Sequence, residues 1–355
     1  DITDGLVVGP DQELVVGVWD PTSEGDQPRG KQVLDPHGIW YTAVTGIWQT
    51  VWLEPVPELH IRSLETTPRP EAGGVEVRVG VSGSPDPVQV RIAVSAGGIE
   101  VAAGGGLSGE SISISIPEAR LWSPDDPFLY DFQVEIDGGD AVESYFGMRS
   151  IEIAPDDEGR QRLVLNGDPL FQYGTLDQGW WPDGLYTAPT DEALAFDVEM
   201  TKAMGFNLIR KHVKVEPARW YYHCDQLGIL VWQDMPSGDN EGEPAQAQFA
   251  RELEGVLGFL KNHPSIVMWV PFNEGWGQHD TEGVVAWLES ADPTRLVNNA
   301  SGWTDTGVGD VLDIHRYPGP GAPTPESVSP LRPRAAVLGE FGGLGLPLAC
   351  LLYTS

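Results

Sequence analysis

Two glutamates, Glu274 and Glu340, stand where apolar runs of strand length give way to polar residues. Glu274 follows IVMWVPFN (266–273) and Glu340 lies in AVLGEF (336–341), each with a glycine beside it and an aromatic residue close by. Hydrolysis of a glycosidic bond needs two carboxyls, one to protonate the leaving oxygen and one to attack the anomeric carbon. The pair therefore indicates glycoside chemistry, against the alternative that each is an ordinary solvated surface charge.

The two carboxyls would share the work of a double displacement. A separation of about 5–5.5 Å predicts hydrolysis with retention of configuration through a covalent glycosyl-enzyme. The ionised nucleophile would help its neighbour to keep a proton and act as general acid. After the first step that same neighbour, now ionised, would activate water.

Polar and aromatic side chains follow the other apolar runs of this half of the chain. The candidates for substrate contact are His212, Asp234, Asn273, Trp276, Trp303, His315 and Tyr317. Structural alternatives stay open for several of them. His212 and Lys211 could form an ion-pair cluster, and His315 and Tyr317 could close a turn before Pro318.

Other kinds of catalytic site have weaker support in the sequence. His212, His279 and His315 fit no tight ligand spacing, so we expect no metal. There is no Ser-His-Asp order, no P-loop and no GxGxxG after a strand. A barrel hydrolase acting on amide or phosphate bonds is therefore disfavoured, and no cofactor is expected.

We predict that a parallel sheet covered by helices positions these side chains. The apolar runs after residue 150 are apolar on both faces, as in the strands of such a sheet. Helical stretches separate these runs, which lie at 170–176, 206–212, 229–235, 266–273, 295–301, 311–317 and 336–341. We predict seven β/α units of a (β/α)8 barrel without its eighth strand. Catalytic groups of such barrels lie at the carboxyl ends of the strands.

The first 150 residues follow a different pattern, with short strands separated by turns. Alternating strands at 75–81, 88–94, 111–116 and 128–136 predict a β-sandwich. Two further strands are expected at 14–18 and 47–53. The predicted fold class is multi-domain β and α/β, with domains at 1–57, 58–152 and 153–348 and a non-native tail at 349–355.

Composition narrows the possible partners. The 355 residues include 53 acidic and 21 basic ones, for a formal net charge of -32. Phosphate backbones and anionic lipids repel such a chain, so we expect neither nucleic acid nor membrane as a partner. Cys224 and Cys350 cannot build a disulfide framework, and the oligomeric state and cellular location stay open. The start lacks Met and the features of a signal peptide, so we expect a truncated N-terminus.

The strings FNEGWGQ (272–278) and GEFGG (339–343) resemble family 2 of the glycoside hydrolases, the β-galactosidase, β-glucuronidase and β-mannosidase group. The resemblance extends along the chain. GIWQTVWLEPV (46–56) resembles the end of the family's sugar-binding jelly roll. Its immunoglobulin-like sandwich is matched by LWSPDDPFLYDFQVEI (121–136) and YFGMRSIEI (145–153), and the start of its barrel by LVLNGDPLFQYG (163–174).

This resemblance implies roles for individual residues. Glu274 matches the family's general acid/base and Glu340 its nucleophile. Asn273 matches an asparagine that hydrogen-bonds the substrate 2-hydroxyl, and Tyr317 a tyrosine that donates to the nucleophile. Sugar contacts are implied for the remaining candidates, Trp276, Trp303, His315, Asp234 and His212.

The chain also departs from the family pattern. His212 lies two residues after Arg210, where the family more often has three, which leaves the role of His212 open. The first half of the jelly roll and the eighth barrel strand are not found. The expected function is that of a retaining exo-β-glycosidase, most similar to β-galactosidases, as a fragment truncated at both ends. The alternatives are β-glucuronidase, β-mannosidase or a non-catalytic carbohydrate-binding fragment.

Overall fold

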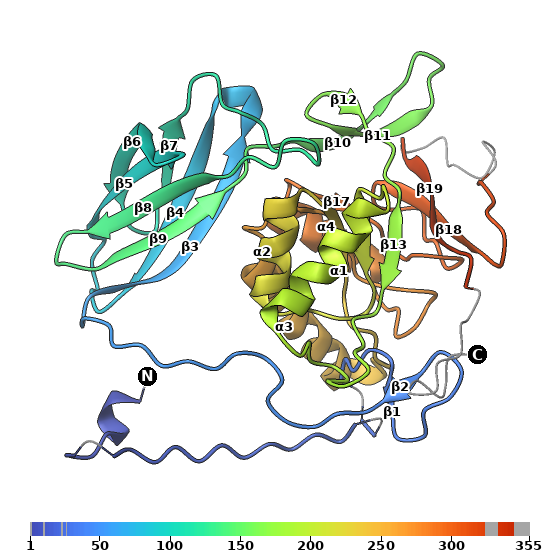
Figure 1. Ribbon diagram of the computed structural model, residues 1–355, viewed down its shortest axis with the longest axis horizontal. Helices are drawn as coiled ribbons and strands as arrows, with labels where there is room; N and C mark the ends of the chain where they lie inside the picture. The colour runs from blue at the N-terminus through green and yellow to red at the C-terminus, as the bar shows by residue number, and fades with distance from the viewer. Residues whose placement is uncertain (1, 10, 23, 26, 324–332, 344–355) are drawn as a thin grey trace.

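The computed structural model describes residues 2–9, 11–22, 24–25, 27–323 and 333–343. The expected tail at 349–355 and Cys350 lie outside these residues. Figure 1 shows a β-sandwich, a small antiparallel sheet beside it and a barrel-like domain of strands and helices. Among the described residues, no helix is both long and apolar enough to cross a membrane.

The sandwich consists of two antiparallel sheets with strand orders β3-β4-β7 and β6-β5-β8-β9. Its strands are β3 (His60–Arg69), β4 (Gly74–Ser82), β5 (Gln89–Ala96), β6 (Ile99–Leu107), β7 (Ser111–Ser115), β8 (Tyr130–Ile136) and β9 (Ala141–Phe146). The predicted alternation is present, because Val75, Val77 and Val79 of β4 are buried while Arg78 is exposed. Side chains of the two inner faces form one apolar core.

The sandwich is held to the barrel-like domain by buried polar contacts. Arg149 donates to the carbonyl oxygens of Pro264, Thr294 and Ile266 at distances of 3.0, 2.6 and 2.8 Å. Burial lowers the pKa of this guanidinium to about 9. Nearby, Trp122 donates to the carbonyl of Asp225. A three-stranded antiparallel sheet of β10 (Ile151–Pro155), β11 (Gln161–Leu165) and β12 (Asp168–Pro169) leads into the next domain.

The barrel-like domain has a five-stranded parallel sheet and a second, two-stranded parallel sheet. The first contains β13 (Gly174–Asp177), β14 (Leu208–Lys211), β15 (Leu230–Asp234), β16 (Ile266–Val270) and β17 (Leu296–Val297). The second contains β18 (Val311–Arg316) and β19 (Ala335–Phe341). Every residue of β14, β15 and β16 is buried, as expected for strands covered on both faces.

Helices follow four of these strands. They are α1 (Asp191–Ala203), α2 (Ala218–Leu227), α3 (Gly242–Leu260) and α4 (Thr281–Ala291). Thr190 caps α1 by accepting from the amide of Ala193, and Gly228 ends α2 in the left-handed conformation. The prediction of seven β/α units is wrong in this respect, because residues 298–310 after β17 form no helix.

The prediction of strands at 14–18 and 47–53 is wrong, because neither stretch forms a strand in the structure. Trp19 and Trp52 are 87% and 68% exposed, so Trp52 is not a core residue. A strand forms only where its backbone groups bond to a neighbouring strand, and these stretches pair with none among the described residues. Between them, β1 (Gln32–Val33) and β2 (Tyr41–Thr42) form a short parallel pair, and in Figure 1 this region lies against the barrel-like domain.

Candidate active site

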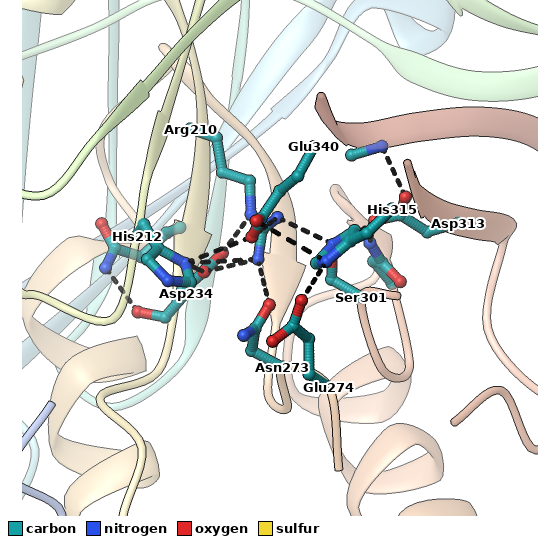
Figure 2. Close-up of polar contacts among 12 residues, drawn as sticks. Arg210, His212, Asp234, Asn273, Glu274, Ser301, Asp313, His315 and Glu340 are labelled. Carbon is teal, nitrogen blue, oxygen red and sulfur yellow. Dashed lines mark hydrogen bonds and ion pairs between the residues drawn. The ribbon is translucent and has the colours of Figure 1, made fainter. Parts of the chain in front are cut away.

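The predicted candidates for catalysis converge where the parallel strands end (Figure 2). Arg210 belongs to β14, Asp234 is the last residue of β15, and Asn273 and Glu274 follow β16. His315 belongs to β18 and Glu340 to β19. Parallel strands bring their carboxyl ends to one edge, so residues 130 positions apart, Arg210 and Glu340, come into contact.

Arg210 is the central cation of the site. Its guanidinium donates to both carboxylate oxygens of Asp234, at 3.0 and 2.8 Å, and to Oε1 of Glu340 at 2.9 Å. It also donates to the side-chain oxygen of Asn273 at 2.9 Å. Burial alone would lower its pKa, but the charges of Asp234 and Glu340 outweigh burial and raise it. The guanidinium is thus a permanent charge with a fixed orientation.

Glu340 is held as a carboxylate. Oε1 accepts from Arg210, and the phenol of Tyr317 donates to Oε2. Burial acts to raise the pKa of Glu340, but the positive charge of Arg210 and the hydrogen bond from Tyr317 are among the influences that together outweigh it, and the pKa is lowered. An ionised carboxylate with fixed orientation has the properties of a nucleophile.

The backbone of Glu274 is strained, and its side chain points toward His315. Its φ of 55° is in the left-handed region, which is costly for a residue other than glycine. Its amide donates to the carbonyl of Ser301 at 2.8 Å. Gly302 must be glycine here, because its φ is 106° and a Cβ would lie 3.2 Å from both Glu274 Cγ and His315 Nδ1.

The two carboxyls meet at His315. Its Nδ1 lies 2.6 Å from Oε1 of Glu274 and 3.6 Å from Oε2 of Glu340. One side-chain oxygen of each glutamate and the imidazole nitrogen all lie within 4.8 Å of one another. One carboxyl thus has a cation and a phenol as partners and the other has an imidazole, which suits a nucleophile beside a proton donor.

Two further residues, missed in the sequence, lie behind His315. The hydroxyl of Ser301 is 2.7 Å from Nε2 of His315 and donates to the buried carboxyl of Asp313. Burial raises the pKa of Asp313. The sequence could have indicated Asp313, because Asp313 and His315 are two positions apart on one strand and side chains at that spacing lie on the same face.

His212 and Asp234 are bound to each other rather than open to solvent. Nδ1 of His212 lies 2.7 Å from Oδ2 of Asp234, and both side chains are buried beside Arg210. Burial lowers the pKa of His212. Lys211 faces the other way, with ion pairs to Asp177 and Glu216 at 2.7 and 3.0 Å. The ion-pair alternative therefore holds for Lys211, while a sugar contact by His212 or Asp234 stays a prediction.

The aromatic candidates lie at the rim. Trp303 is 65% exposed and its ring centroid is 5.7 Å from that of His315. Trp276 is half-buried and stacks on Trp40 at 5.1 Å between ring centroids. Trp303 and Trp276 thus offer flat apolar faces of the kind that sugar rings cover, and Tyr317 is also partly exposed.

A segment of the N-terminal region completes this side of the site, which the sequence did not predict. The amides of Arg29 and Gly30 donate to the carbonyl of Ser237 at 2.8 and 2.9 Å. Lys31, next along the chain, is only 8% exposed. Its ammonium has no hydrogen-bond or ion-pair partner among the described residues. Burial lowers the pKa of Lys31 although the charges of Glu340 and Glu274 act to raise it.

The three groups that meet at the site, Glu274, His315 and Glu340, are chemically able to ligate a metal ion. Arg210 and Tyr317 already bind both oxygens of Glu340, and a cation there would lie beside the guanidinium. These contacts disfavour a metal ion at the three groups. His279, predicted as a weak metal candidate, bonds to the carbonyl of Gly277 instead.

The fold and the site together define a β-sandwich followed by a barrel with a carboxyl pair at its strand ends. The sequence profile of glycosyl hydrolases family 2 matches residues 59–149, and that of the family's TIM barrel domain matches residues 187–318. The chain therefore belongs to glycosyl hydrolase family 2, and the predicted resemblance is confirmed.

Individual relatives show how far the likeness extends. A β-galactosidase from Vibrio vulnificus is 30% identical over 56% of this chain and 20% of its own length. A β-glycosidase structure from Bacteroides vulgatus has a TM-score of 0.69 and 25% identity, over 79% of this chain and 38% of that one. The structure of Bacteroides uniformis β-glucuronidase 3 has a TM-score of 0.61 and 25% identity, over 75% and 36%. The chain spans about one fifth of the length of the first curated relatives that it matches.

Proposed function

We propose that this chain carries the catalytic centre of a retaining exo-β-glycosidase, with β-galactosidase-like enzymes as the most similar group. Glu340 is the nucleophile and Glu274 the general acid/base. The observation that carries the proposal is the pair of carboxyls whose oxygens lie within 4.8 Å, one bound by Arg210 and the other by His315. That spacing suits double displacement, since inverting enzymes need a wider gap to admit water.

In the first step, a carboxylate oxygen of Glu340 attacks the anomeric carbon while Glu274 gives its proton to the leaving oxygen. Arg210 and Tyr317 keep Glu340 ionised and oriented for this attack. In the second step, Glu274 takes a proton from water, and that water displaces Glu340 from the sugar. Asn273 has its side-chain oxygen bound to Arg210, so its amide nitrogen is the group that would donate to the 2-hydroxyl.

The finer architecture is part of the proposal. We assign residues 58–152 to an immunoglobulin-like sandwich and residues 153–348 to a barrel without its eighth strand. Residues 1–57 would belong to a sugar-binding jelly roll, a proposal supported by Lys31 in the field of the two glutamates and by Trp40 stacked on Trp276. The sugar rings would stack on Trp276 and Trp303, with His315, His212 and Asp234 as further candidate contacts.

β-Glucuronidase activity is a second candidate, because the ammonium of Lys31 lies in the field of Glu274 and Glu340 with no ion-pair partner among the described residues. A sugar carboxylate would pair with that ammonium. Turnover of nitrophenyl β-D-galactoside, glucuronide, mannoside and glucoside by the chain would separate the alternatives. A glucuronidase is expected to lose rate with Lys31→Gln, and a galactosidase to change little.

Trapping of the covalent intermediate tests the mechanism directly. A 2-deoxy-2-fluoro glycoside with a good leaving group should attach its sugar to Glu340, which peptide mass spectrometry would locate. Glu340→Gln should prevent attachment and lower turnover at least about a thousandfold, as loss of a nucleophile does elsewhere. Attachment at another residue would contradict the assignment. Sugar binding with no attachment and no turnover would favour the non-catalytic carbohydrate-binding alternative.

A further inference from the structure

Four side chains form one unbroken hydrogen-bonded series that begins at Glu274 and ends inside the protein (Figure 2). Glu274 Oε1 lies 2.6 Å from His315 Nδ1, and His315 Nε2 lies 2.7 Å from the hydroxyl of Ser301. Ser301 in turn donates to Asp313. Asp313 is 1% exposed and the side chain of His315 is fully buried, so water does not interrupt the series.

Counting protons in this series gives two possible arrangements. Ser301 has a single hydroxyl proton and a neutral His315 has a single ring proton. In the first arrangement Glu274 is protonated and donates to Nδ1, Nε2–H donates to Ser301, and Ser301 donates to an ionised Asp313. In the second arrangement each of the three hydrogen bonds has its donor and acceptor exchanged. Asp313 is then protonated and Glu274 is ionised. The two differ by the shift of one proton across each link.

We propose that Asp313 is a proton reservoir for the acid/base Glu274, connected to it through Ser301 and His315. This inference rests on the proposed function for its catalytic consequence. Glu274 must be protonated when the leaving group departs and ionised when water attacks. The series supplies the first state by a proton shift from Asp313, and accepts the proton that Glu274 takes from water in the second step. Asp313 and Ser301 are therefore positioning residues that act through Glu274.

The surroundings of Asp313 suit a carboxyl that can hold either charge state. The amide of Gly339 donates to Oδ1 at 2.6 Å, and the side-chain amide of Asn298 donates to Oδ2 at 2.7 Å. Burial raises the pKa of Asp313, against the positive charge of Arg210. Two opposed influences bring the protonated and ionised forms closer in free energy.

The surroundings of His315 favour passage of a proton over its storage. Glu274 and Glu340 face Nδ1, and Ser301 faces Nε2. The guanidinium of Arg210 lies 3.4 Å from Nε2 and opposes a second positive charge on the ring. Each ring nitrogen of His315 therefore faces a side chain with which it can exchange a proton.

Asp313→Asn gives a sharp test, because the structure sets the direction of the new amide. Its oxygen would accept from Gly339 N–H, so its NH2 would donate to Ser301. Asn298 can rotate to accept as well, since its side-chain oxygen is buried without a partner. Ser301 would then donate to His315, and Nδ1–H to an ionised Glu274. In this variant Glu274 should still act as a base in the second step but no longer as an acid in the first.

The measurement compares a phenyl glycoside, whose departure needs a proton, with a 2,4-dinitrophenyl glycoside, whose departure does not. We expect Asp313→Asn and Ser301→Ala to slow turnover of the phenyl glycoside about 100-fold, the size of a general-acid contribution. The dinitrophenyl glycoside should change less than about threefold. Ser265→Ala is the control. It removes another buried hydroxyl, just before β16, and should not change turnover of either substrate. If the variants slowed turnover of both substrates equally, or slowed neither, the proposal would be overturned.

A second readout does not depend on turnover. In ¹⁵N-histidine-labelled protein, with His315 assigned by its loss in His315→Gln, Asp313→Asn should fix the ring as the Nδ1–H tautomer. Wild type should show exchange between the two neutral tautomers. An unchanged ring state in Asp313→Asn would overturn the proton series. Failure of wild type to hydrolyse any glycoside would instead count against the proposed function.

Discussion

The guanidinium of Arg210 lies 2.9 Å from a carboxylate oxygen of Glu340 in a buried contact between β14 and β19. These strands belong to two different sheets of the barrel-like domain. The contact therefore orients the carboxylate proposed as nucleophile and also links one sheet to the other. Asp234 shares the same cation, so the pair is part of a network of three charges.

Arg210→Met should damage both stability and catalysis, because it leaves Asp234 and Glu340 buried without their cation. We expect a loss of about 3–5 kcal/mol in the free energy of unfolding, the usual result of breaking a buried ion pair. Urea unfolding followed by tryptophan fluorescence would measure it. Arg62→Met, on an exposed position of β3, is the matched control and should stay within about 0.5 kcal/mol. Similar curves for the two variants would contradict the role of Arg210.

The same network predicts a dependence of stability on acid pH. The pKa values of Asp234 and Glu340 are lowered in the folded protein, because the charge of Arg210 together with their other partners outweighs the effect of burial. Their contribution is therefore present above the unfolded-state pKa of about 4, and is lost as pH falls through the lower folded-state value. The difference in unfolding free energy between wild type and Asp234→Asn should shrink between about pH 6 and pH 3. A constant difference would contradict this sign, and Asp239→Asn, at an exposed ion pair with Arg29, serves as control.

Tyr317→Phe should slow catalysis with little effect on substrate binding. The phenol donates to the nucleophile Glu340, and a hydrogen bond to a charged group is worth about 1.5–3 kcal/mol. We therefore expect kcat to fall about 10- to 100-fold while KM changes little. Tyr173→Phe makes the same change at a partly exposed tyrosine before β13 and should leave kcat unaltered. An equal fall in both variants, or a change confined to KM, would argue against this contact.

Trp40→Ala should loosen the N-terminal segment from the site. Trp40 stacks on Trp276, and an aromatic pair is worth about 0.5–1.5 kcal/mol beyond the area that it buries. We expect kcat/KM to fall about tenfold and proteolysis between Lys31 and Trp48 to accelerate. Trp19→Ala removes an exposed tryptophan and is the matched control. If both variants are cleaved at the wild-type rate, the segment does not depend on this stack.

Much of the architecture was predictable because each pattern reports a local environment. Val75, Val77 and Val79 alternate with polar residues since β4 has one buried face, and residues 229–232 are all apolar since β15 is covered on both faces. Residues 14–18 show where this reasoning fails. They are rich in β-branched residues, yet a strand also needs a neighbouring strand to pair with, and the residues of one strand do not specify that neighbour.

The sequence by itself determined the family and the two glutamates, because FNEG and GEFGG are short strings whose residue types already specify the chemistry. Only the tertiary structure decided which charges surround them. Arg210, Asp313 and Lys31 lie 27 to 309 positions from Glu340 in the chain, and no local pattern relates such residues. Convergence of the strand ends brings Arg210 and Asp313 to the site, and the N-terminal segment brings Lys31. This proximity makes one carboxyl a stable anion and gives the other a partner for its proton.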